Sequence, residues 1–401
     1  MIALYVRRTR HRPRLNFLSQ SHKPLVIRNA RTRPIRILVL GPSLEILGGQ
    51  SVQVSRLLAA LRSHSAVEVS FLAMNPRLPR PLHALQRMKF VRTVVTLLYY
   101  LATLPRAVAR CDVLHVFSPS YWAYLLGPLP AMLIGRLMKK TVILDYHSGE
   151  ADDHLRRWAI SAKSIRRLAS TISVPSEYLR NIFHAHGLVA SCIPNIVSAT
   201  KLPFRERREL QPRILSNRNL EAMYDVATVI HAFARISQVF PQATLTIAGE
   251  GSQREHLRTL AERVSSTRIV FLGRVEPNQM ATHYDSADLY LNASRIDNQP
   301  LSLIEAMLCG VPVVTTNSGG IPWLVKHGTT GLLANAGDDE VIAAHALRLL
   351  DDPEMAQRIA TSAREYALIE FSEERVVPQW IELYVSLVQK HSGSSGNRVG
   401  A

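Results

Sequence analysis

The sequence predicts an α/β protein with two doubly wound parallel-sheet domains that face a cleft. The chain has 401 residues, which is long for one domain and comfortable for two. Short apolar runs rich in β-forming residues alternate with helical patterns almost from end to end. Residues 197–212 interrupt this alternation with a polar, charged stretch that contains two prolines, as a linker between domains does.

Each half of the chain contains five expected strands, which are short and apolar enough to be buried on both faces. In the first half they cover residues 35–41, 67–73, 112–118, 141–146 and 170–176. In the second half they cover residues 213–217, 243–249, 268–273, 288–294 and 311–316. Helical patterns such as 52–64, 228–240 and 253–264 lie between the strands. Because helices connect successive strands, we expect parallel sheets with helices on both faces.

These patterns divide the chain into five parts. Residues 1–33 form a basic leader, which either is a disordered arm or results from a start codon placed too far upstream. Residues 34–197 and 198–372 are the two expected domains. Residues 373–390 form a helix that we expect to pack back toward the first domain, and the Gly/Ser-rich tail 391–401 is expected to be disordered.

The net charge of +17 is concentrated in the first half of the chain. Residues 1–36 contain ten basic and no acidic residues, residues 37–190 contain 18 and 8, and residues 191–401 contain 20 and 23. A basic first half favours an anionic partner such as a phosphorylated acceptor, a membrane surface or nucleic acid, or else is a solvated surface. Nucleic-acid binding is not expected, because no recognition module follows the leader.

Two apolar stretches raise the question of membrane contact. Residues 90–104 are too short to span a bilayer, and residues 121–138 contain Gly127, two prolines and Arg136. The first stretch is flanked by Arg87, Lys89, Arg92 and Arg106, which suits a helix lying on anionic lipid, but a buried helix of the α/β domain is the alternative.

The three cysteines indicate a reducing compartment. Cys111, Cys192 and Cys309 lie far apart, without a CxxC pair or a Cys/His cluster. This spacing argues against a disulfide framework or a structural zinc site and fits the cytoplasm. We therefore expect a cytoplasmic protein, with peripheral contact at the inner face of the membrane as an open alternative.

Glycines and one arginine follow expected strands. Gly48 and Gly49 follow the first strand and open a helix, where backbone amides favour a phosphate. Arg218 comes directly after strand 213–217, where its guanidinium is placed to grip a diphosphate with two hydrogen bonds. Residues 249–251, Gly-Glu-Gly, follow strand 243–249 and suit the close approach of a base or ribose. A simple turn or a surface arginine is the structural alternative for each.

Residues 294–325 carry the most informative motif. Asp297 lies in a loop, and Glu305 lies eight positions later in a helix that we expect to begin near Leu301 and to end at Gly310. Carboxylates accept paired hydroxyl hydrogen bonds, which suits sugar and ribose rings. The amides of Asn298, Gln299 and Leu301 lie near a helix N-terminus, which stabilises a phosphate. A capping Asp and an N-terminal helix carboxylate are the structural alternative.

With these motifs in order, residues 36–390 resemble glycosyltransferase family 4, which consists of retaining enzymes of the GT-B fold. The stretches that carry the resemblance are Gly48-Gly49, VPSEYLR (174–180), IPN (193–195), SNRNLE (216–221), GEG (249–251), FLGR (271–274), YDSADLYLNAS (284–294), LIEAMLCGVPVVTTNSGGIP (303–322) and HGTTGLL (327–333). The pair Asp297 and Glu305 resembles the family's paired glutamates with seven residues between them. This match covers most of the chain.

The resemblance implies a role for each of these residues. Gly48 and Gly49 contact the donor phosphates, and Arg218 binds the diphosphate. Asp297 binds donor-sugar hydroxyls, Glu305 binds the nucleotide ribose, and His147 lies on the acceptor side. The remaining residues expected around the donor are Gly249, Glu250, Gly251, Arg274, Asn298, Gln299 and Leu301. His147, Arg218 and Asp297 form the expected catalytic set.

The sequence departs from the family pattern at three positions. The first carboxylate is Asp297 rather than Glu, and Trp323 follows GGIP where Glu is usual. The family's lysine, five residues after the arginine, corresponds to Met223, and no Lys occurs between Lys201 and Lys326. One positive charge near the donor phosphate is therefore missing.

The resemblance implies a hexosyltransferase-type enzyme that transfers a sugar from a UDP- or GDP-sugar to a glycan, lipid-linked or small-molecule acceptor. Cell-envelope or polysaccharide synthesis is the expected setting. No cofactor and no metal are expected, because no spaced acidic DxD motif lies in a suitable loop. The missing lysine leaves open a catalytically weak or inactive scaffold that binds nucleotide or glycan. A nucleotide-sugar epimerase, which shares the architecture, is disfavoured by the stretch from Asp297 to Glu305.

Overall fold

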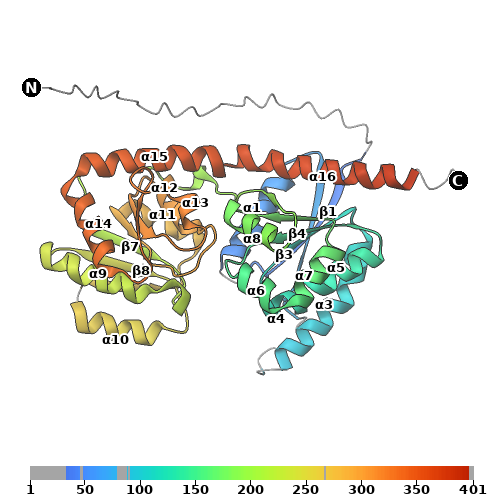
Figure 1. The fold of residues 1–401 in the computed structure, drawn as a ribbon, viewed down its shortest axis with the longest axis horizontal. Helices are drawn as coiled ribbons and strands as arrows, with labels where there is room; N and C mark the ends of the chain where they lie inside the picture. Colours follow the sequence, from blue (N-terminus) through green and yellow to red (C-terminus); the bar gives the residue numbers. More distant parts are fainter. Residues whose placement is uncertain (1–32, 46–47, 79–87, 89–90, 266–267, 397–401) are drawn as a thin grey trace, which may run out of the picture. The chain divides into compact units, whose positions relative to one another are not determined.

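Two six-stranded sheets of parallel strands form the framework of the protein (Figure 1). The computed structural model describes residues 33–45, 48–78, 88, 91–265 and 268–396. Residues 34–401 cluster into one compact unit, separate from residues 1–33. Apart from Arg33, the predicted leader lies outside the described residues, as do Phe90, Arg87 and Lys89 at the start of the predicted membrane-contact stretch.

The N-terminal sheet has the strand order β2-β1-β3-β4-β5-β6. Its strands are β1 (Ile35–Gly41), β2 (Val67–Ala73), β3 (Val113–Ser118), β4 (Thr141–Tyr146), β5 (Thr171–Val174) and β6 (Ser191–Cys192). Its helices are α1 (Gly49–Arg62), α3 (Val91–Ala109), α4 (Tyr121–Leu126), α5 (Pro128–Leu137), α6 (Ala151–Arg157), α7 (Ala159–Leu168) and α8 (Glu177–Ala185). Alternate residues of β1 enter different hydrophobic clusters, so both faces of the sheet are covered.

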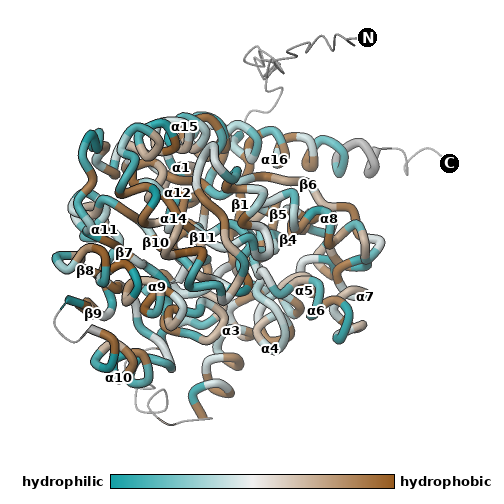
Figure 2. The backbone as a smooth tube through the Cα atoms, turned by 60° about the vertical axis from the view of Figure 1, so that its left-hand side comes forward, coloured by the Kyte–Doolittle hydropathy of each residue, from teal (hydrophilic) through white to brown (hydrophobic). Residues whose placement is uncertain are grey.

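The C-terminal sheet has the strand order β12-β11-β10-β7-β8-β9. Its strands are β7 (Arg213–Asn217), β8 (Thr244–Ala248), β9 (Ile269–Gly273), β10 (Leu289–Leu291), β11 (Val313–Thr316) and β12 (Leu332–Ala334). Its helices are α9 (Val226–Val239), α10 (Arg254–Ser265), α11 (Pro277–Ser286), α12 (Leu301–Leu308), α13 (Ile321–Leu324), α14 (Asp339–Asp351) and α15 (Pro353–Phe371). Hydrophobic and hydrophilic turns alternate along helices such as α10 (Figure 2), because one side of each helix faces the core.

The strand order fixes where a ligand can bind. In each sheet the order reverses beside the first strand, between β1 and β3 and between β7 and β10. Loops that leave two neighbouring strands in opposite directions open a crevice at their carboxyl ends. The two-sheet α/β fold predicted from the sequence is thus confirmed, and the crevices are lined by the loops after β1, β3, β7 and β10.

The strand boundaries follow the sequence closely, with differences at β10 and at the edge strands β6 and β12. The predicted strand 288–294 is a strand only over Leu289–Leu291. The Asn292 backbone N–H still donates to the Val314 carbonyl at 3.1 Å, and beyond it the Ser294 hydroxyl donates to the Asn292 side chain at 2.8 Å. Strands β6 and β12 are two and three residues long and were not predicted. Helix α12 begins at Leu301 as predicted, and Gly310 beyond its end has a φ of 70°.

The predicted linker is anchored to the C-terminal domain by its arginines. Arg207 is buried and donates to the carbonyl oxygens of Ala287 at 2.8 Å and Tyr284 at 2.8 Å. Arg205 forms an ion pair with the fully buried Asp288 at 2.7 Å, and Arg213 of β7 pairs with the same carboxylate at 2.7 Å. Burial lowers the pKa of Arg207 to about 10. This polar stretch therefore supplies charge partners to the sheet instead of acting as a loose tether.

Helix α3 has both a buried side and an exposed apolar side, whereas the sequence left open a helix buried in the domain or a helix lying on lipid. Its residues Thr96, Tyr100, Leu104 and Val108 recur every four positions and are buried against the N-terminal domain. Val94 and Leu98 on another side of the helix are exposed. No helix in the described part of the chain is long and apolar enough to cross a membrane.

The last helix packs on the N-terminal domain. Helix α16 (Glu373–Gly396) follows α15 after Ser372, and Figure 1 shows the two helices running one after the other past both sheets. Val376, Trp380, Ile381 and Tyr384 of α16 share a hydrophobic cluster with β1. The helix continues to Gly396 and not to the predicted end at Lys390, because weak helix-forming residues do not by themselves end a helix.

Replacing Trp380 by Ala is expected to destabilise the N-terminal domain by about 3–5 kcal/mol, because a buried aromatic side chain leaves a cavity. The side chain is 3% exposed and packs against the ring of His115, with ring centroids 4.6 Å apart. Glu382→Ala on the exposed side of α16 is the control. Urea denaturation monitored by far-ultraviolet circular dichroism measures the unfolding free energy of both variants, because this signal comes mainly from the backbone and not from tryptophan. Equal unfolding free energies for the two would show that α16 does not stabilise this domain.

Candidate functional site

A cavity of about 780 Å³ lies where the loops of the two sheets meet. Twelve of the residues predicted from the sequence line it: Gly48, Gly49, His147, Arg218, Gly249, Glu250, Arg274, Asp297, Asn298, Gln299, Leu301 and Glu305. Gly251 does not line the cavity. An added Cβ there would lie 2.3 Å from the carbonyl oxygen of Leu220, so this glycine allows two chain segments to pack closely.

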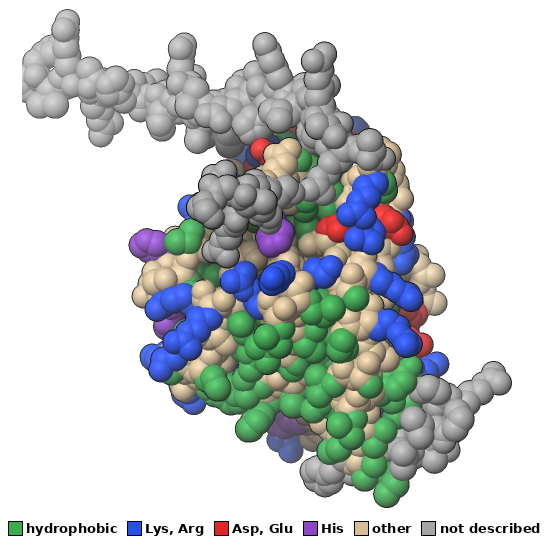
Figure 3. Space-filling model, turned by 90° about the vertical axis from the view of Figure 1, so that its right-hand side faces the viewer, with side chains coloured by type: hydrophobic (Ala, Val, Ile, Leu, Met, Phe, Trp, Pro, Cys, Tyr) green, Lys and Arg blue, Asp and Glu red, His purple; other side chains and the backbone are tan. Residues whose placement is uncertain are grey.

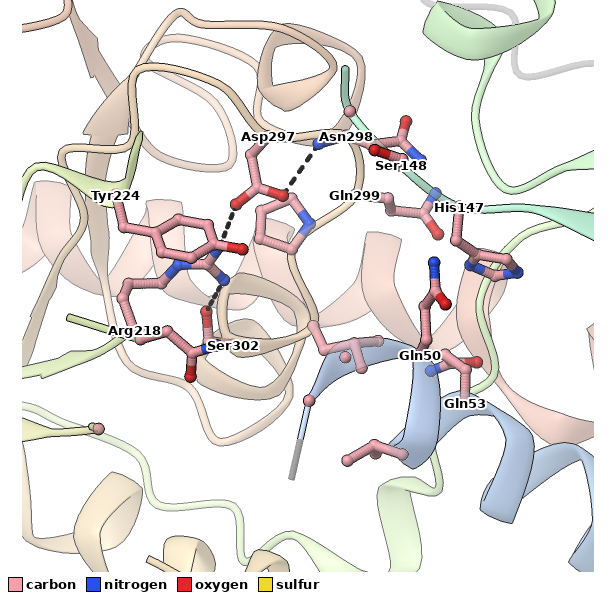
Figure 4. Close-up of a pocket in the computed structure, with 18 of the residues that line it drawn as sticks. Gln50, Gln53, His147, Ser148, Arg218, Tyr224, Asp297, Asn298, Gln299 and Ser302 are labelled. Atoms are coloured by element: carbon pink, nitrogen blue, oxygen red, sulfur yellow. Dashed lines mark hydrogen bonds and ion pairs between the residues drawn. The ribbon is translucent and has the colours of Figure 1, made fainter. Parts of the chain in front are cut away.

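Arg218 occupies the crevice of the C-terminal sheet. It follows β7, and its Nη2 forms a hydrogen-bonded ion pair with Asp297, in the loop after the neighbouring strand β10. Its Nη1 lies 3.3 Å from Ser302 Oγ, and its guanidinium lies 4.1 Å from the centroid of the Tyr224 ring (Figure 4). Its Nε is buried without a hydrogen-bond partner. Only 12% of the side chain is exposed, so the guanidinium is held in a fixed orientation.

Asp297 completes a buried ion pair. Its side chain is 13% exposed, and its Oδ1 accepts a hydrogen bond from the backbone N–H of Asn298 at 2.9 Å. Burial raises the pKa of the Asp297 carboxyl, and the neighbouring Arg218 guanidinium opposes that rise. A Cβ on Gly319, whose φ is 57°, would lie 2.1 Å from the Asp297 carbonyl oxygen. The glycine pair 319–320 therefore lets the β11 loop close against the Asp297 backbone.

Both carboxylate oxygens of Glu305 are engaged. Arg56 Nη2 of α1 lies 2.5 Å from Glu305 Oε1, and the Tyr284 hydroxyl donates to Oε2 at 3.0 Å. Arg56 thus links the N-terminal domain to a carboxylate of the C-terminal domain. The sequence analysis missed Arg56, because a single arginine in an amphipathic helix carries no signal that distinguishes it from a solvated residue.

Asn298 and Gln299 join the two domains through their side chains. Ser176 hydrogen-bonds to the Asn298 side-chain oxygen. The Gln299 side chain donates to the Pro175 carbonyl at 2.7 Å and accepts from the Asn195 backbone N–H at 2.9 Å. The Asn298 amide that was expected to face a phosphate bonds instead to the Asp297 carboxylate. Asn298 and Gln299 line the cavity, but the hydrogen bonds of their side chains connect the two domains.

His147 is tied to a buried polar chain. It follows β4, and its Nε2 lies 2.9 Å from Oδ2 of Asp145, which also lies 3.3 Å from His115 Nε2. His115 Nδ1 in turn lies 2.8 Å from the Tyr384 hydroxyl of α16. Burial raises the pKa of Asp145, but the charge of His147 and the hydrogen bonds from both histidines outweigh it and lower the pKa to about 2. A charged residue in the apolar strand TVILDY was a sequence signal for this chain of contacts.

The outer parts of the cavity are more exposed. Arg274 donates to the Glu45 carbonyl at 3.2 Å and pairs with Glu276 at 3.3 Å, while Glu250 pairs with Arg254 at 2.7 Å. An added Cβ on Gly48 or Gly49 would meet open space, so this loop leaves room for a ligand next to the start of α1.

Three further lining residues were not singled out as binding residues from the sequence. Tyr121, with a φ of 56°, donates to Asp153 at 2.5 Å. Glu150 lines the same cavity, and burial raises the pKa of its carboxyl. Met223 lines the cavity at the position where the family lysine was expected. The site thus contains a methionine next to the stacked pair Tyr224 and Arg218.

Part of this chain matches known proteins. Residues 199–366 match the family model described as Glycosyl transferases group 1. The chain is 33% identical over 172 residues to the N-acetyl-alpha-D-glucosaminyl L-malate synthase of Bacillus anthracis. The aligned residues cover 43% of this chain and 44% of that protein. The chain is 28% identical over 296 residues to the glycogen synthase of Mycobacterium tuberculosis, which covers 69% of each. The chain thus spans less than half of the first relative's length.

Solved structures share the fold. Anabaena HepE in complex with UDP and glucose has a TM-score of 0.68 at 18% identity, covering 88% of this chain and all (100%) of that one. Sucrose-phosphate synthase from Thermosynechococcus elongatus has a TM-score of 0.72 at 18% identity, covering 89% and 100%. Residues 199–366 thus resemble the group 1 glycosyltransferases, and the two-sheet architecture of the chain is that of these solved structures.

Proposed function

We propose that this glycosyltransferase moves a sugar from a UDP- or GDP-sugar to a glycan, lipid-linked or small-molecule acceptor with retention of configuration. Cell-envelope or polysaccharide synthesis on the cytoplasmic side is the proposed setting. The observation that carries the proposal is the buried Arg218–Asp297 pair in the crevice between β7 and β10. A nearly buried guanidinium with one unpartnered nitrogen suits a diphosphate, which offers several acceptor oxygens.

The proposed reaction needs no protein nucleophile. The bond between the sugar carbon and the leaving diphosphate breaks while the bond to the acceptor oxygen forms on the same face. The diphosphate takes the proton of the incoming hydroxyl. Arg218 stabilises the charge on the leaving phosphate, Asp297 binds a donor-sugar hydroxyl, and Glu305 binds the ribose. His147, held by Asp145, orients the sugar or the acceptor.

The missing lysine bears on both candidate functions. Arg274 lines the same cavity as Met223, and we propose that it supplies the second positive charge near the donor phosphates. The second candidate is a scaffold that binds nucleotide or glycan with little or no turnover, which Met223 favours. Nucleotide release from UDP-glucose, GDP-mannose and ADP-glucose, measured with a panel of acceptors, separates the two. Binding with no release for any donor and acceptor pair would support the scaffold.

Arg218→Ala and Glu305→Ala are each expected to weaken donor binding about tenfold or more, because a hydrogen bond to a charged group contributes roughly 1.5–3 kcal/mol. Calorimetric titration with the best-binding nucleotide sugar measures the effect. Arg258→Ala on the exposed side of α10 is the matched control. Arg218→Ala also leaves Asp297 buried without its partner, so thermal unfolding of each variant must first show an intact fold. Unchanged affinity in both folded variants would remove these residues from the donor site.

Transfer is expected to proceed without a divalent metal. The sequence contains no spaced acidic motif in a suitable loop that would hold a metal on the donor diphosphate, and in the described part of the chain no three His, Cys, Asp or Glu side chains gather as a metal site made by the protein alone would require. Activity in excess EDTA should therefore equal activity in untreated buffer. Loss of transfer in EDTA that Mg²⁺ or Mn²⁺ restores would contradict the proposed mechanism.

A further inference from the structure

Three consecutive helices of the N-terminal domain expose large apolar side chains on one face. We call this surface, formed by α3, α4 and α5, the α3–α5 face. Its exposed apolar residues are Val94, Leu98, Trp122, Leu126, Leu133 and Leu137. Leu98 is 61% and Leu137 is 73% exposed. A cluster of this kind on a folded domain marks an interaction site, whereas scattered single residues do not.

The helices are neighbours, so their exposed residues form one surface. The Tyr100 hydroxyl of α3 donates to the carbonyl of Gly127, the residue between α4 and α5, at 3.1 Å. The same three helices bury their other sides, since Tyr100, Tyr124 and Met132 belong to one core cluster. Figure 3 shows a continuous hydrophobic area on this side of the molecule. The apolar residues left outside are therefore not needed to complete the domain core.

The charge of this surface is mainly basic, with the acidic Asp153 of α6 beside α4, where it accepts a hydrogen bond from Tyr121. The described residues between positions 69 and 144 include seven Lys and Arg and one acidic residue, Asp112. The three helices themselves contain no Asp or Glu. Asp112 is engaged by Arg36 at 2.9 Å. Arg92, Arg106 and Arg136 are exposed, and Figure 3 shows basic side chains bordering the hydrophobic area.

We propose that the α3–α5 face docks on the surface of an anionic lipid bilayer. A bilayer offers both partners that this face lacks, an apolar interior within about 5–10 Å of the surface and anionic headgroups around it. A protein partner would need an apolar centre surrounded by acidic residues, and a second copy of this face would bring like charges together. With no spanning helix among the described residues, the contact is peripheral.

The face begins at the rim of the cavity. Tyr121 lines the cavity, while the next residue, Trp122, is 68% exposed on the α3–α5 face. A protein docked through this face therefore holds that rim of the cavity at the lipid surface. If the proposed transfer is correct, an acceptor carried by a lipid reaches the cavity along this rim; the docking itself does not depend on the donor chemistry.

The test compares variants of the full chain in sedimentation with vesicles of phosphatidylcholine and phosphatidylglycerol. The apolar variant is Leu98→Gln/Leu133→Gln/Leu137→Gln, and the basic variant is Arg92→Gln/Arg106→Gln/Arg136→Gln. Their matched controls alter exposed residues of the same kind elsewhere, Val189→Gln/Val239→Gln/Ile369→Gln and Arg258→Gln/Arg263→Gln/Arg348→Gln. All variants keep residues 1–33, so a contribution of the leader is the same in each. Nucleotide-sugar affinity, measured without lipid, should be unchanged in all four.

The wild-type chain should bind anionic vesicles and bind pure phosphatidylcholine far more weakly, with binding that falls as salt rises. The apolar and basic variants should each lower the partition coefficient about tenfold or more, and the controls should stay within about twofold. Three results would overturn the proposal: no binding by the wild-type chain, binding that both patch variants retain, or a dimer in sedimentation velocity that the apolar variant abolishes while vesicle binding persists.

Discussion

The buried pair of Arg218 and Asp297 is the constraint around which the site is built. Two opposite charges that are nearly removed from water are stable only while each remains paired and hydrogen-bonded. Ser302 and the ring of Tyr224 hold the guanidinium, and the glycines at 319–320 let a loop close on the backbone of Asp297. A diphosphate that enters here meets an arginine already oriented, so little side-chain entropy is lost on binding.

The cavity exists because the two domains share polar contacts around it. Arg56 reaches Glu305, and Gln299 bonds to the backbone of Pro175 and Asn195. Three of the side chains assigned to the donor, Asn298, Gln299 and Glu305, thus also join the domains. Helix α16 adds a second connection, because Tyr384 extends the buried chain of His115 and Asp145 that ends at His147. The His147 ring is therefore positioned by a helix that lies at the other end of the sequence.

Much of the fold could be predicted because parallel strands buried on both faces appear as largely apolar runs, as in Ile35–Gly41. The cavity residues after these strands could be located from the rule that ligands bind at carboxyl ends of strands. Contacts between residues that lie far apart in the sequence could not be predicted in this way. The sequence around Arg56 does not show that Arg56 contacts Glu305. Gly251 lies in a glycine-rich loop of the kind that binds ligands, but in the structure it allows two chain segments to pack closely. The short strands β6 and β12 depend on neighbours in the sheet, not on their own sequences.

Met223 and Arg274 line the cavity together with Arg218, so the proposed donor site has a methionine where the resembled family has a lysine, and an arginine elsewhere on the cavity wall. Whether the diphosphate lies at Arg218 decides the proposed chemistry most directly. A crystal structure of the protein with UDP or GDP, whichever raises the melting temperature more, measures this. The expected result is a phosphate oxygen within about 3 Å of an Arg218 guanidinium nitrogen and the ribose beside Glu305. A nucleotide bound outside the cavity, or in it without a phosphate contact to Arg218, would contradict the proposed donor site.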